Sequence, residues 1–357
     1  MTSSALLRLN GVVKKFGTFT ALHGIDLEIN EGEFFTIVGP SGSGKSTMIR
    51  LLVGMDEVTS GEIMLRDQRM DQTPANLRPT CMVFQSLALF PHMSVGQNIE
   101  FPLKLRKETP AKRRARAEEL LDLLRLPREY YDKRISQCSG GEQQRVALAR
   151  ALAFDPEILF FDEPLSALDY RLRKTLEKEL KDLHARTGKT FVYITHSLEE
   201  AMVMSDRIAI MKDGRFEQIA VADEIYDRPI SRFVAEFMGE VNLFPVTADA
   251  DGRLTGDNLI VGSGVTQSTI QNGREGLLMV RPEYMQFVTG KKTCDYTITG
   301  SVLAEYALGS RIQYEIELAD GTVITVEKLR EERLDAPDGQ QVHLSFDAAN
   351  SHLIKDA

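Results

Sequence analysis

The sequence is poor in cysteine, and its three cysteines lie far apart. Cys81, Cys138 and Cys294 include no CxxC pair, so they form neither a disulfide framework nor a recognisable zinc site. This cysteine usage is typical of a protein in a reducing cytosol.

Long hydrophobic runs are also lacking. No apolar run approaches the ~18 residues that a membrane-spanning helix needs. The first ten residues, MTSSALLRLN, have neither the charged start nor the apolar core of a signal peptide. We therefore expect that, if the protein works at a membrane, another protein holds it there.

Basic residues are in the minority, and the formal net charge is -9. This acidic balance argues against a general nucleic-acid-binding protein, which would present a basic face. The one basic run, KRRAR at 112–116, is typical of a solvated helix face. The length of 357 residues predicts two or three globular domains, each large enough to bury its own core.

The pattern of apolar and polar residues changes near residue 240. Residues 1–240 alternate short apolar runs with helical patterns, which predicts an α/β domain with a largely parallel sheet. Little strand signal occurs between about 90 and 155, so we expect an inserted helical subdomain there. Residues 241–357 alternate polar and apolar residues between Gly and Asp turns, which predicts a small antiparallel β-barrel. In the first domain we expect strands at 33–38, 80–84, 157–161, 190–195 and 207–211, and helices at 46–54 and 115–126.

The stretch GPSGSGKST at 39–47 matches the phosphate-loop pattern G-x-x-x-x-G-K-[ST]. It lies between a predicted strand and a predicted helix, which is the context that this pattern requires. Its glycines let backbone N–H groups converge on phosphate oxygens, and the helix N-terminus adds the positive end of its dipole. Lys45 is expected to reach the β and γ phosphates, and the Ser46 hydroxyl to ligate Mg²⁺. The predicted nucleotide-binding residues are Gly39, Pro40, Ser41, Gly42, Ser43, Gly44, Lys45, Ser46 and Thr47.

Two acidic residues, Asp162 and Glu163, follow the apolar run ILFF. They are therefore expected at the carboxyl end of a strand, where α/β sheets bind ligands. We expect Asp162 to hold Mg²⁺, directly or through water, and Glu163 to act as the general base on the attacking water. An Asp-Glu pair alone is weak support for this chemistry, but downstream of a phosphate loop it becomes strong.

These motifs resemble those of the nucleotide-binding subunit of an ABC transporter. In that resemblance GPSGSGKST is the Walker A motif, ILFFDEP the Walker B motif and CSGGEQQR the signature motif. Gln85 matches the Q-loop, SALD at 166–169 the D-loop and His196 the switch histidine. The resemblance implies an α/β P-loop NTPase, the ABC cassette with its inserted helical subdomain, followed by a C-terminal all-β, OB-like barrel of the TOBE type.

The resemblance also implies a head-to-tail dimer that binds ATP and Mg²⁺. Ser139, Gly140 and Gly141 would hold the γ-phosphate bound to the partner's Walker A loop, because they open a helix whose dipole favours an anion. Taken alone, SGG before a helix is more often a plain cap. Two residues depart from the family pattern. Cys138 replaces the usual leucine and is also small and apolar, while Glu142 stands where glutamine is frequent and suits the first helical turn.

The resemblance assigns roles to four more residues, and for three of them an ordinary structural role stays open. Phe16 would stack on adenine, or be an aromatic residue of the strand core. Gln85 would take part in catalysis and Mg²⁺ binding, or be a polar residue at a strand end. His196 would hydrogen-bond the γ-phosphate and help organise the transition state, or be a capping or core histidine. Asp169 would order the dimer interface.

The kind of transporter follows from the same resemblance. Because no membrane segment is predicted, the pore would belong to two separate permease subunits, which favours an importer on the cytoplasmic face of the inner (plasma) membrane. A periplasmic or extracellular solute-binding protein would be an indirect partner, and no nucleic acid is expected. LALFPHMSVGQNIEFPL at 87–103 resembles the segment that docks the coupling helix of the membrane subunit.

RFVAEFMGEVNLF at 232–244 most resembles the spermidine/putrescine importer branch. Importers of ferric iron or a sugar are the alternatives. A soluble ABC ATPase of DNA repair or translation is the remote alternative, because its relatives carry coiled-coil insertions or two cassettes. A regulatory role of residues 241–357 also stays open.

Overall fold

The computed structural model describes residues 5–166, 168–248, 254–261, 275–288 and 295–354. The chain divides into two compact units, an N-terminal unit (Met1–Ala222) and a C-terminal unit (Asp223–Ala357). This division lies before residue 240, where the change of sequence texture had placed the domain boundary. The structure thus assigns residues 223–240 to the C-terminal unit.

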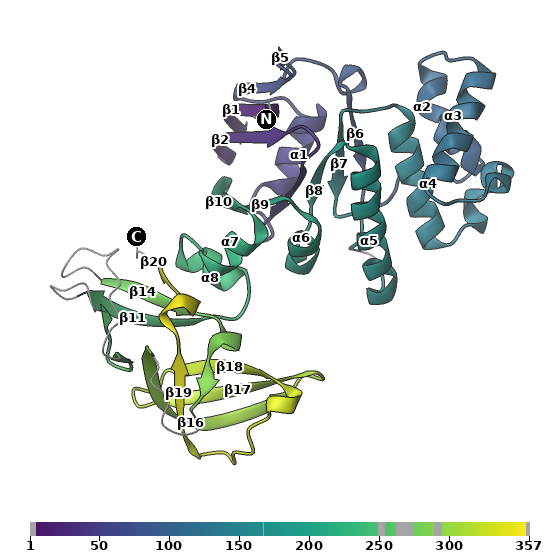
Figure 1. The fold of residues 1–357 in the computed structure, drawn as a ribbon. Coiled ribbons are helices and arrows are strands. Elements are labelled where there is room, and N and C mark those ends of the chain that lie inside the picture. Colours follow the sequence, from purple (N-terminus) through teal and green to yellow (C-terminus); the bar gives the residue numbers. More distant parts are fainter. Residues whose placement is uncertain (1–4, 167, 249–253, 262–274, 289–294, 355–357) are drawn as a thin grey trace. The chain divides into compact units, whose positions relative to one another are not determined.

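A six-stranded sheet with the order β10-β9-β3-β8-β7-β6 forms the centre of the N-terminal unit (Figure 1). Its five strands from β9 to β6 pair in parallel, and β10 is antiparallel to β9. All residues of β3 and β8 are buried, as expected for parallel strands that are covered on both faces. The bounds are β3 (Phe34–Val38), β6 (Thr80–Val83), β7 (Ile158–Asp162), β8 (Thr190–Ile194), β9 (Arg207–Lys212) and β10 (Arg215–Ala220). The five strands predicted from the sequence are all present.

The two faces of this sheet pack into different cores. Leu159 and Phe161 of β7 belong to one core, and Phe160 between them belongs to the other, because successive side chains of a strand point to opposite faces. The first core contains α5 (Tyr170–Thr187), α6 (Leu198–Met204) and the helical region. The second contains α1 (Lys45–Val53) and an antiparallel sheet of order β2-β1-β4-β5. The bounds of that sheet are β1 (Ala5–Phe16), β2 (Phe19–Asn30), β4 (Ser60–Leu65) and β5 (Gln68–Arg69).

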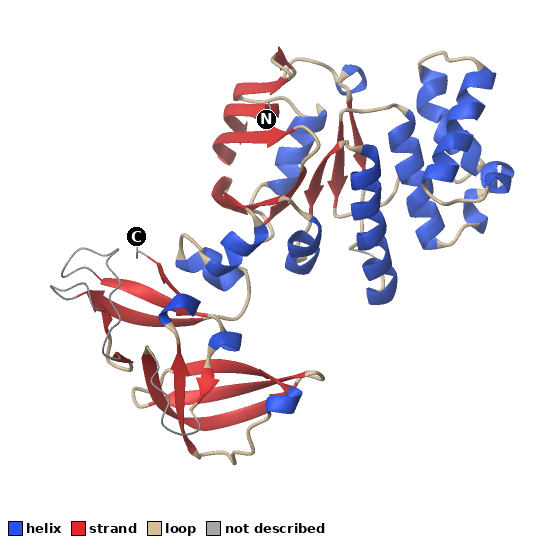
Figure 2. Ribbon diagram, in the orientation of Figure 1, coloured by secondary structure: helices blue, strands red, loops and turns tan. Residues whose placement is uncertain are grey.

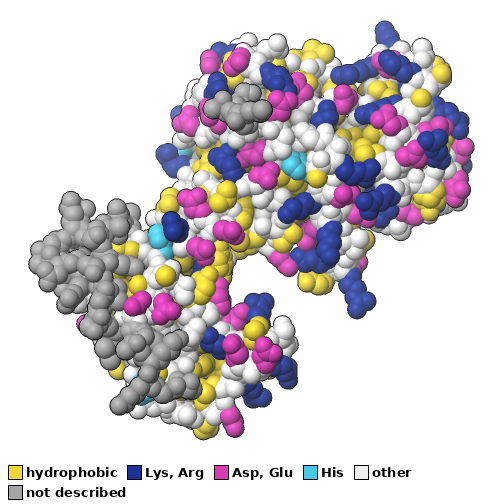
Figure 3. Space-filling view, viewed as in Figure 1, with side chains coloured by type: hydrophobic (Ala, Val, Ile, Leu, Met, Phe, Trp, Pro, Cys, Tyr) yellow, Lys and Arg dark blue, Asp and Glu magenta, His cyan; other side chains and the backbone are white. Residues whose placement is uncertain are grey.

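Between β6 and β7 the chain contains helices and no strand, as the sequence predicted (Figure 2). Residues of α2 (Val95–Leu105), α3 (Pro110–Leu123) and α4 (Gly140–Ala153) share one core. Basic and acidic side chains are interspersed over this region (Figure 3). In the basic run of α3, Lys112 and Arg114 are exposed and pair with Glu108 and Glu118, which agrees with a solvated helix face at these two positions. Within the described residues, no helix combines the length and the apolar character that crossing a membrane requires.

The C-terminal unit is an all-antiparallel, OB-like β domain preceded by two short helices, which agrees with the predicted β-barrel (Figure 2). Its strands alternate buried and exposed residues, as in the pattern eBiBiBeB of β17, so one face of each strand builds the core. The two sheets follow the orders β12-β11-β14-β20 and β15-β19-β16-β17-β18, with β13 paired to β16. The bounds are α7 (Ala222–Asp227), α8 (Arg232–Phe237), β11 (Asn242–Ala248), β12 (Leu254–Thr255), β13 (Ile260–Val261), β14 (Glu275–Val280), β15 (Gln286–Phe287), β16 (Tyr296–Ala307), β17 (Arg311–Leu318), β18 (Val323–Leu329), β19 (Gln341–Phe346) and β20 (Ser351–Ile354).

A fully buried arginine joins the two short helices to this β domain. Arg281, just after β14, has an exposed fraction of 0%. Its guanidinium donates to the backbone carbonyls of Tyr226 at 2.9 Å, Ala235 at 3.0 Å and Glu240 at 3.2 Å. It also lies over the Tyr226 ring, 4.1 Å from its centroid. These contacts tie the segment 226–240 to the β domain and account for its place in the C-terminal unit.

Candidate functional site

The predicted phosphate loop connects β3 to α1 and lines a pocket of about 470 Å³. Gly42 and Gly44 have φ values of 81° and 109°, which L side chains rarely adopt. The N-cap of α1 is Gly44, which has no side chain to cap the helix, so the amide donors of the first turn face the pocket without a capping oxygen. The pocket is lined by Phe19, Ala21, Ser41, Gly42, Ser43, Gly44, Lys45, Ser46, Thr47 and Glu163.

Close packing explains why Gly39 begins the loop. A Cβ atom at Gly39 would lie 2.1 Å from the carbonyl oxygen of Met211 in β9. That oxygen belongs to a strand of the central sheet and cannot easily move away. The loop backbone therefore lies against β9, which fixes its path beside the carboxyl ends of the strands.

Lys45 brings a buried cation to the loop, with an exposed fraction of 8%. Its ammonium donates to the carbonyl oxygens of Gly39 at 2.7 Å and Pro40 at 2.9 Å. Burial lowers the pKa of Lys45, and the nearby Glu163 and Asp162 carboxylates oppose that shift. Burial and the Glu163 charge raise the pKa of Asp162, while Lys45 lowers it. The site thus contains one cation and two carboxylates, a set that suits a phosphate group together with a divalent cation.

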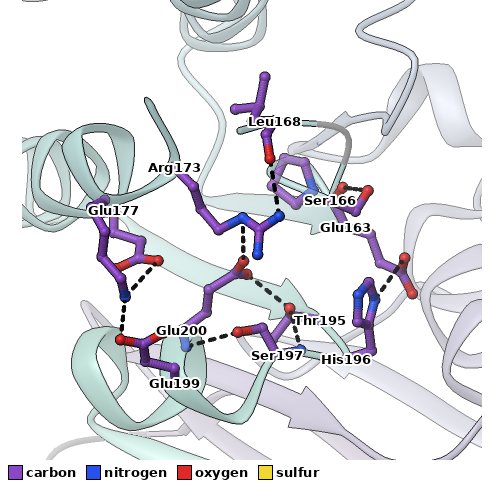
Figure 4. A network of polar contacts seen from close by, with 12 residues as sticks. Glu163, Ser166, Leu168, Arg173, Glu177, Thr195, His196, Ser197, Glu199 and Glu200 are labelled. Atoms are coloured by element: carbon purple, nitrogen blue, oxygen red, sulfur yellow. Dashed lines mark hydrogen bonds and ion pairs between the residues drawn. The ribbon is translucent and has the colours of Figure 1, made fainter. Parts of the chain in front are cut away.

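Glu163 and His196 lie together at the carboxyl ends of β7 and β8 (Figure 4). His196 Nδ1 is 3.2 Å from Glu163 Oε2. Glu163 has a φ of 46°, which is uncommon for a residue with a side chain and often marks a functional position. The backbone N–H of Glu163 donates to the carbonyl of Ile194 at 2.9 Å, so β8 holds this strained residue in place. Since the His196 side chain is 63% exposed, the core-histidine alternative is wrong.

Gln85 joins the same site through a residue to which sequence analysis assigned no role of its own. The Gln85 amide donates to Ser166 Oγ at 3.0 Å, and the Ser166 hydroxyl donates to the Glu163 carbonyl at 2.9 Å. Gln85 is exposed and lies in the turn after β6. The structure therefore brings Gln85, Glu163 and His196 together, although they are widely separated along the chain.

The turn after Gln85 is held by an arginine that sequence analysis also missed. Leu87 and Ala88 have φ values of 58° and 46°. The guanidinium of Arg150 in α4 donates to their carbonyl oxygens at 2.7 and 2.6 Å. Arg150 thus connects the helix that begins in the signature motif to the Q-loop turn.

The signature motif caps α4 in this chain. Ser139 Oγ accepts from the amide of Glu142 at 3.4 Å, and the Ser139 amide donates to Glu142 Oε2 at 2.8 Å, which together form a capping box. The Ser139 amide, followed by the Tyr130 hydroxyl and the Lys133 ammonium, lowers the pKa of Glu142. The buried Cys138 thiol has a raised pKa, chiefly because of burial, which disfavours a reactive thiolate.

Gly140 and Gly141 follow Ser139 in the first turn of α4. Neither they nor Ser139 line the pocket of the phosphate loop. The plain-cap alternative therefore describes what Ser139 does within one chain. Contact of these three residues with a partner's phosphate stays a prediction.

Phe19 lines the pocket and Phe16 does not; stacking of Phe16 on adenine stays a prediction. The two are paired across the β1–β2 hairpin. Phe16 is 50% exposed, so the alternative of a core aromatic is wrong. Asp169 accepts from the Leu172 amide at 3.0 Å and is the N-cap of α5. Of the residues named from the sequence, Ala167 in the D-loop and Cys294 lie outside the described residues.

Comparisons with known proteins agree with these motifs. Residues 22–166 match the ABC transporter family, and residues 278–354 match the TOBE domain family. The spermidine/putrescine import ATP-binding protein PotA of Roseobacter denitrificans is 42% identical over 322 residues, which is 89% of this chain and 88% of that protein. This chain belongs to the ABC transporter ATP-binding proteins. The family predicted from the motifs is thereby confirmed, and the chain is an ATPase with a TOBE domain.

Other members of the ABC transporter family differ in the solute that their names record. The PotA protein of Methylococcus capsulatus is 43% identical, covering 97% of this chain and 91% of that protein. The sulfate/thiosulfate import ATP-binding protein CysA of a Synechocystis strain is 40% identical, covering 97% and 98%. Identity at this level therefore does not separate the solutes.

Solved structures of the ABC transporter family match the cassette part of this chain. A dimeric ATP-binding cassette in a post-hydrolysis state, bound to ADP and Pi, has a TM-score of 0.53 and 35% identity, covering 60% of this chain and 98% of that chain. The protein cbiO1 of Clostridium perfringens, part of an ABC transporter complex, has a TM-score of 0.58 and 28% identity, covering 62% and 90%. The predicted cassette fold is confirmed.

Proposed function

We propose that this ABC transporter ATPase is the motor subunit of a polyamine importer. Two copies form a head-to-tail dimer, and ATP binding and hydrolysis in that dimer drive two separate permease subunits. A solute-binding protein delivers the polyamine from outside, and the permeases hold the motor at the cytoplasmic face of the membrane. The observation that carries the catalytic part is the Glu163–His196 pair, 3.2 Å apart beside the pocket of the phosphate loop.

The residues in and beside the pocket have different roles in ATP hydrolysis. Lys45 and the amides at the start of α1 bind the β and γ phosphates. Glu163 takes a proton from the attacking water, and His196, beside Glu163, hydrogen-bonds the γ-phosphate. Ser46, Gln85 and Asp162 would hold Mg²⁺, which neutralises phosphate charge when it is bound. Gly39, Pro40, Ser41, Gly42, Ser43, Gly44 and Thr47 shape the loop, and the exposed Phe16 is available to stack on the adenine beside Phe19.

Glu163→Gln tests the general base. The carboxamide keeps the shape of the side chain and loses its basicity, so hydrolysis should fall ~10²–10⁴-fold while ATP binding persists. Glu157→Gln, at the other end of β7, is the matched control and should leave both quantities unchanged. The measurements are ATP turnover and ATP affinity of the full-length protein. Near-normal turnover of the Glu163 variant would remove Glu163 from this role.

The head-to-tail arrangement assigns Ser139, Gly140 and Gly141 to the ATP of the partner. Lys45→Ala disables the phosphate loop, and Ser139→Arg blocks the signature turn with bulk, so each homodimer contains two broken sites. In a mixed dimer one site carries both lesions, and the other joins an intact loop to an intact signature turn. Asp169, at the start of α5, would order the contact between the copies.

Mixing the two variants should therefore restore measurable ATP hydrolysis. If the signature turn acts on ATP in its own subunit, every site carries a lesion and mixing restores nothing. Exchange of subunits is followed with two fluorescent labels, and ATP binding to the intact site is measured at the same time. No recovery, with both exchange and binding demonstrated, contradicts the head-to-tail arrangement.

The polyamine assignment is supported by the names of the PotA relatives and by the resemblance of residues 232–244. The CysA relative provides the competing solute class, sulfate or thiosulfate. Membrane subunits that co-purify with this chain are reconstituted with it in vesicles, and uptake of labelled spermidine, putrescine and sulfate is compared. If the vesicles take up sulfate but neither polyamine in an ATP-dependent way, the polyamine assignment is wrong and the transported solute is an oxyanion. The segment 87–103 supplies the docking surface for the permease in either case.

A further inference from the structure

Glu200 is a buried acid near the catalytic residues. It lies in the first turn of α6, and only 2% of its surface is exposed. Its Oε2 atom accepts two hydrogen bonds at 2.8 Å, one from the Tyr193 hydroxyl and one from the Thr195 hydroxyl. A carboxylate in such a position must be held by its partners, because burial without them is costly.

The local sequence predicts a different role for Glu200, as the closing residue of a capping box, and the structure does not show that role. Ser197 is the N-cap of α6, and Glu200 stands three residues later, the spacing of a capping box. At Ser94 and Ser139, the Gln or Glu three residues on bonds back to the serine amide and closes such a box. The Glu200 carboxylate instead points inward and bonds the Tyr193 and Thr195 hydroxyls. It does not bond the Ser197 amide at the start of its helix.

The Thr195 hydroxyl connects the Glu200 carboxylate by hydrogen bonds to the backbone on either side of His196. Thr195 Oγ1 donates to Glu200 and accepts from the Ser197 amide at 3.0 Å. Thr195 and Ser197 are the two neighbours of His196, so these bonds fix the backbone on both sides of that residue (Figure 4). The imidazole of His196 itself is exposed and contacts Glu163, and its position depends on this backbone.

The second oxygen of Glu200 faces a residue that holds the D-loop. Glu200 Oε1 is 3.9 Å from Arg173 Nε, and Arg173 Nη2 donates to the carbonyl of Leu168 at 3.0 Å. Leu168 belongs to the loop at 166–169, whose Ser166 contacts Gln85 and the Glu163 carbonyl. One buried carboxylate therefore connects the loop of His196 with the loop that follows Glu163.

We propose that Glu200 is a positioning residue for ATP hydrolysis, which sets the His196 loop and the D-loop in one joint arrangement through Thr195 and Arg173. Asp169 of the D-loop is proposed to order the contact between the two copies, so Glu200 links the placement of His196 to the loop at that contact. This inference rests on the proposed role of His196. Glu200 touches neither substrate nor reacting atoms and acts only through these neighbours.

Glu200→Gln removes the charge and breaks one of the two links, to Thr195 or to Arg173, without changing the shape of the side chain. If the amide oxygen keeps the bonds from Tyr193 and Thr195, the amide NH₂ faces the guanidinium of Arg173. If the amide turns over, the two hydroxyl groups lose their acceptor. Either way one link fails. Because small misplacements of catalytic groups can cost ~10²-fold, we expect kcat of the full-length protein to fall about 10- to 100-fold, with the KM for ATP changed less than about threefold.

Glu199→Gln is the matched control, because it makes the same change at the next position of α6. The Glu199 side chain is 60% exposed and pairs with Lys174 at the surface, so kcat should stay at the wild-type value. Thr195→Val removes only the hydroxyl and should lower kcat like Glu200→Gln. Thr195→Ser keeps a hydroxyl and should restore most of the activity. Because the loss of either link breaks the joint arrangement of the two loops, the double variant should lose no more activity than the more severe of the two single variants.

The outcomes separate this inference from the proposed function. If His196→Ala hydrolyses ATP at the wild-type rate, the role of His196 fails, and the inference fails with it. If His196→Ala is inactive but Glu200→Gln is normal, only the inference fails. The Glu200→Gln and Thr195→Val variants could instead lose ATP affinity and thermal stability along with kcat, with no recovery in Thr195→Ser. That result would show a purely structural role and overturn the inference. Multiplicative losses in the double variant would also overturn it.

Discussion

Arg281→Met tests why residues 223–240 belong to the C-terminal unit. In the native protein the guanidinium donates to the carbonyl oxygens of Tyr226 and Ala235 at 2.9 and 3.0 Å. Methionine fills much of the same space and provides no donor. A buried carbonyl left without a donor costs about 1–3 kcal/mol, so these two bonds alone correspond to about 2–6 kcal/mol.

Part of this loss is offset, because the charge of Arg281 is itself costly to bury. Its pKa is lowered chiefly by burial, which means that its surroundings disfavour the charged form. Methionine removes that cost and adds apolar contact. We therefore expect Arg281→Met to lower the free energy of unfolding of the C-terminal unit by about 2–4 kcal/mol.

The assay combines denaturant unfolding of the full-length protein with hydrogen exchange at residues 226–240. Arg330→Met is the control, since Arg330 is exposed and its guanidinium donates to the Gly309 carbonyl. It should change stability by no more than about 0.5 kcal/mol. Exchange at 226–240 should accelerate in the Arg281 variant alone. Equal stability of the two variants, or unchanged exchange at 226–240, would refute the reasoning.

Three further perturbations test the N-terminal unit. Gly39→Ala should lower ATP affinity at least tenfold and the free energy of unfolding by about 1–3 kcal/mol, because the new Cβ would lie 2.1 Å from the Met211 carbonyl oxygen. Calorimetric titration with ATP and thermal unfolding measure the two effects. Normal ATP affinity would contradict the prediction. Arg150→Met removes both hydrogen bonds to the turn after β6, so hydrogen exchange there should accelerate and kcat should fall, and unchanged exchange would count against this arginine. Glu142 has a lowered pKa, so its stabilising bonds are present at neutral pH and are lost as pH falls through that pKa. Wild type should therefore be more stable than Glu142→Gln at pH 7, and the difference should shrink toward pH 4; a constant difference would exclude this linkage.

The local sequence was enough to predict the phosphate loop and the strands around it. The loop depends on consecutive residues, because glycines at fixed positions are needed for its backbone path and Lys45 must follow directly. The strands of the central sheet are buried on both faces, so they appear as short apolar runs. The antiparallel sheet escaped prediction because β1 contains register shifts between Leu9 and Val13, which interrupt the two-residue alternation.

Contacts between distant residues were decided only by the tertiary structure. Phe19 and Phe16 are both aromatic residues of one hairpin, and nothing in their order indicates which lines the pocket. The inward turn of Glu200 could not be predicted either, since Ser197 and Glu200 have the spacing of an ordinary capping box.

The boundary near residue 240 shows the same limit. The change of texture at 240 is local, whereas the division at Ala222 and Asp223 reflects the bonds from Arg281 to residues 226–240. Sequence patterns record which residues are buried and how the backbone turns, because both depend on neighbouring residues. Which buried polar group meets which partner depends on packing between segments far apart in the chain, and that is settled only when the chain has folded.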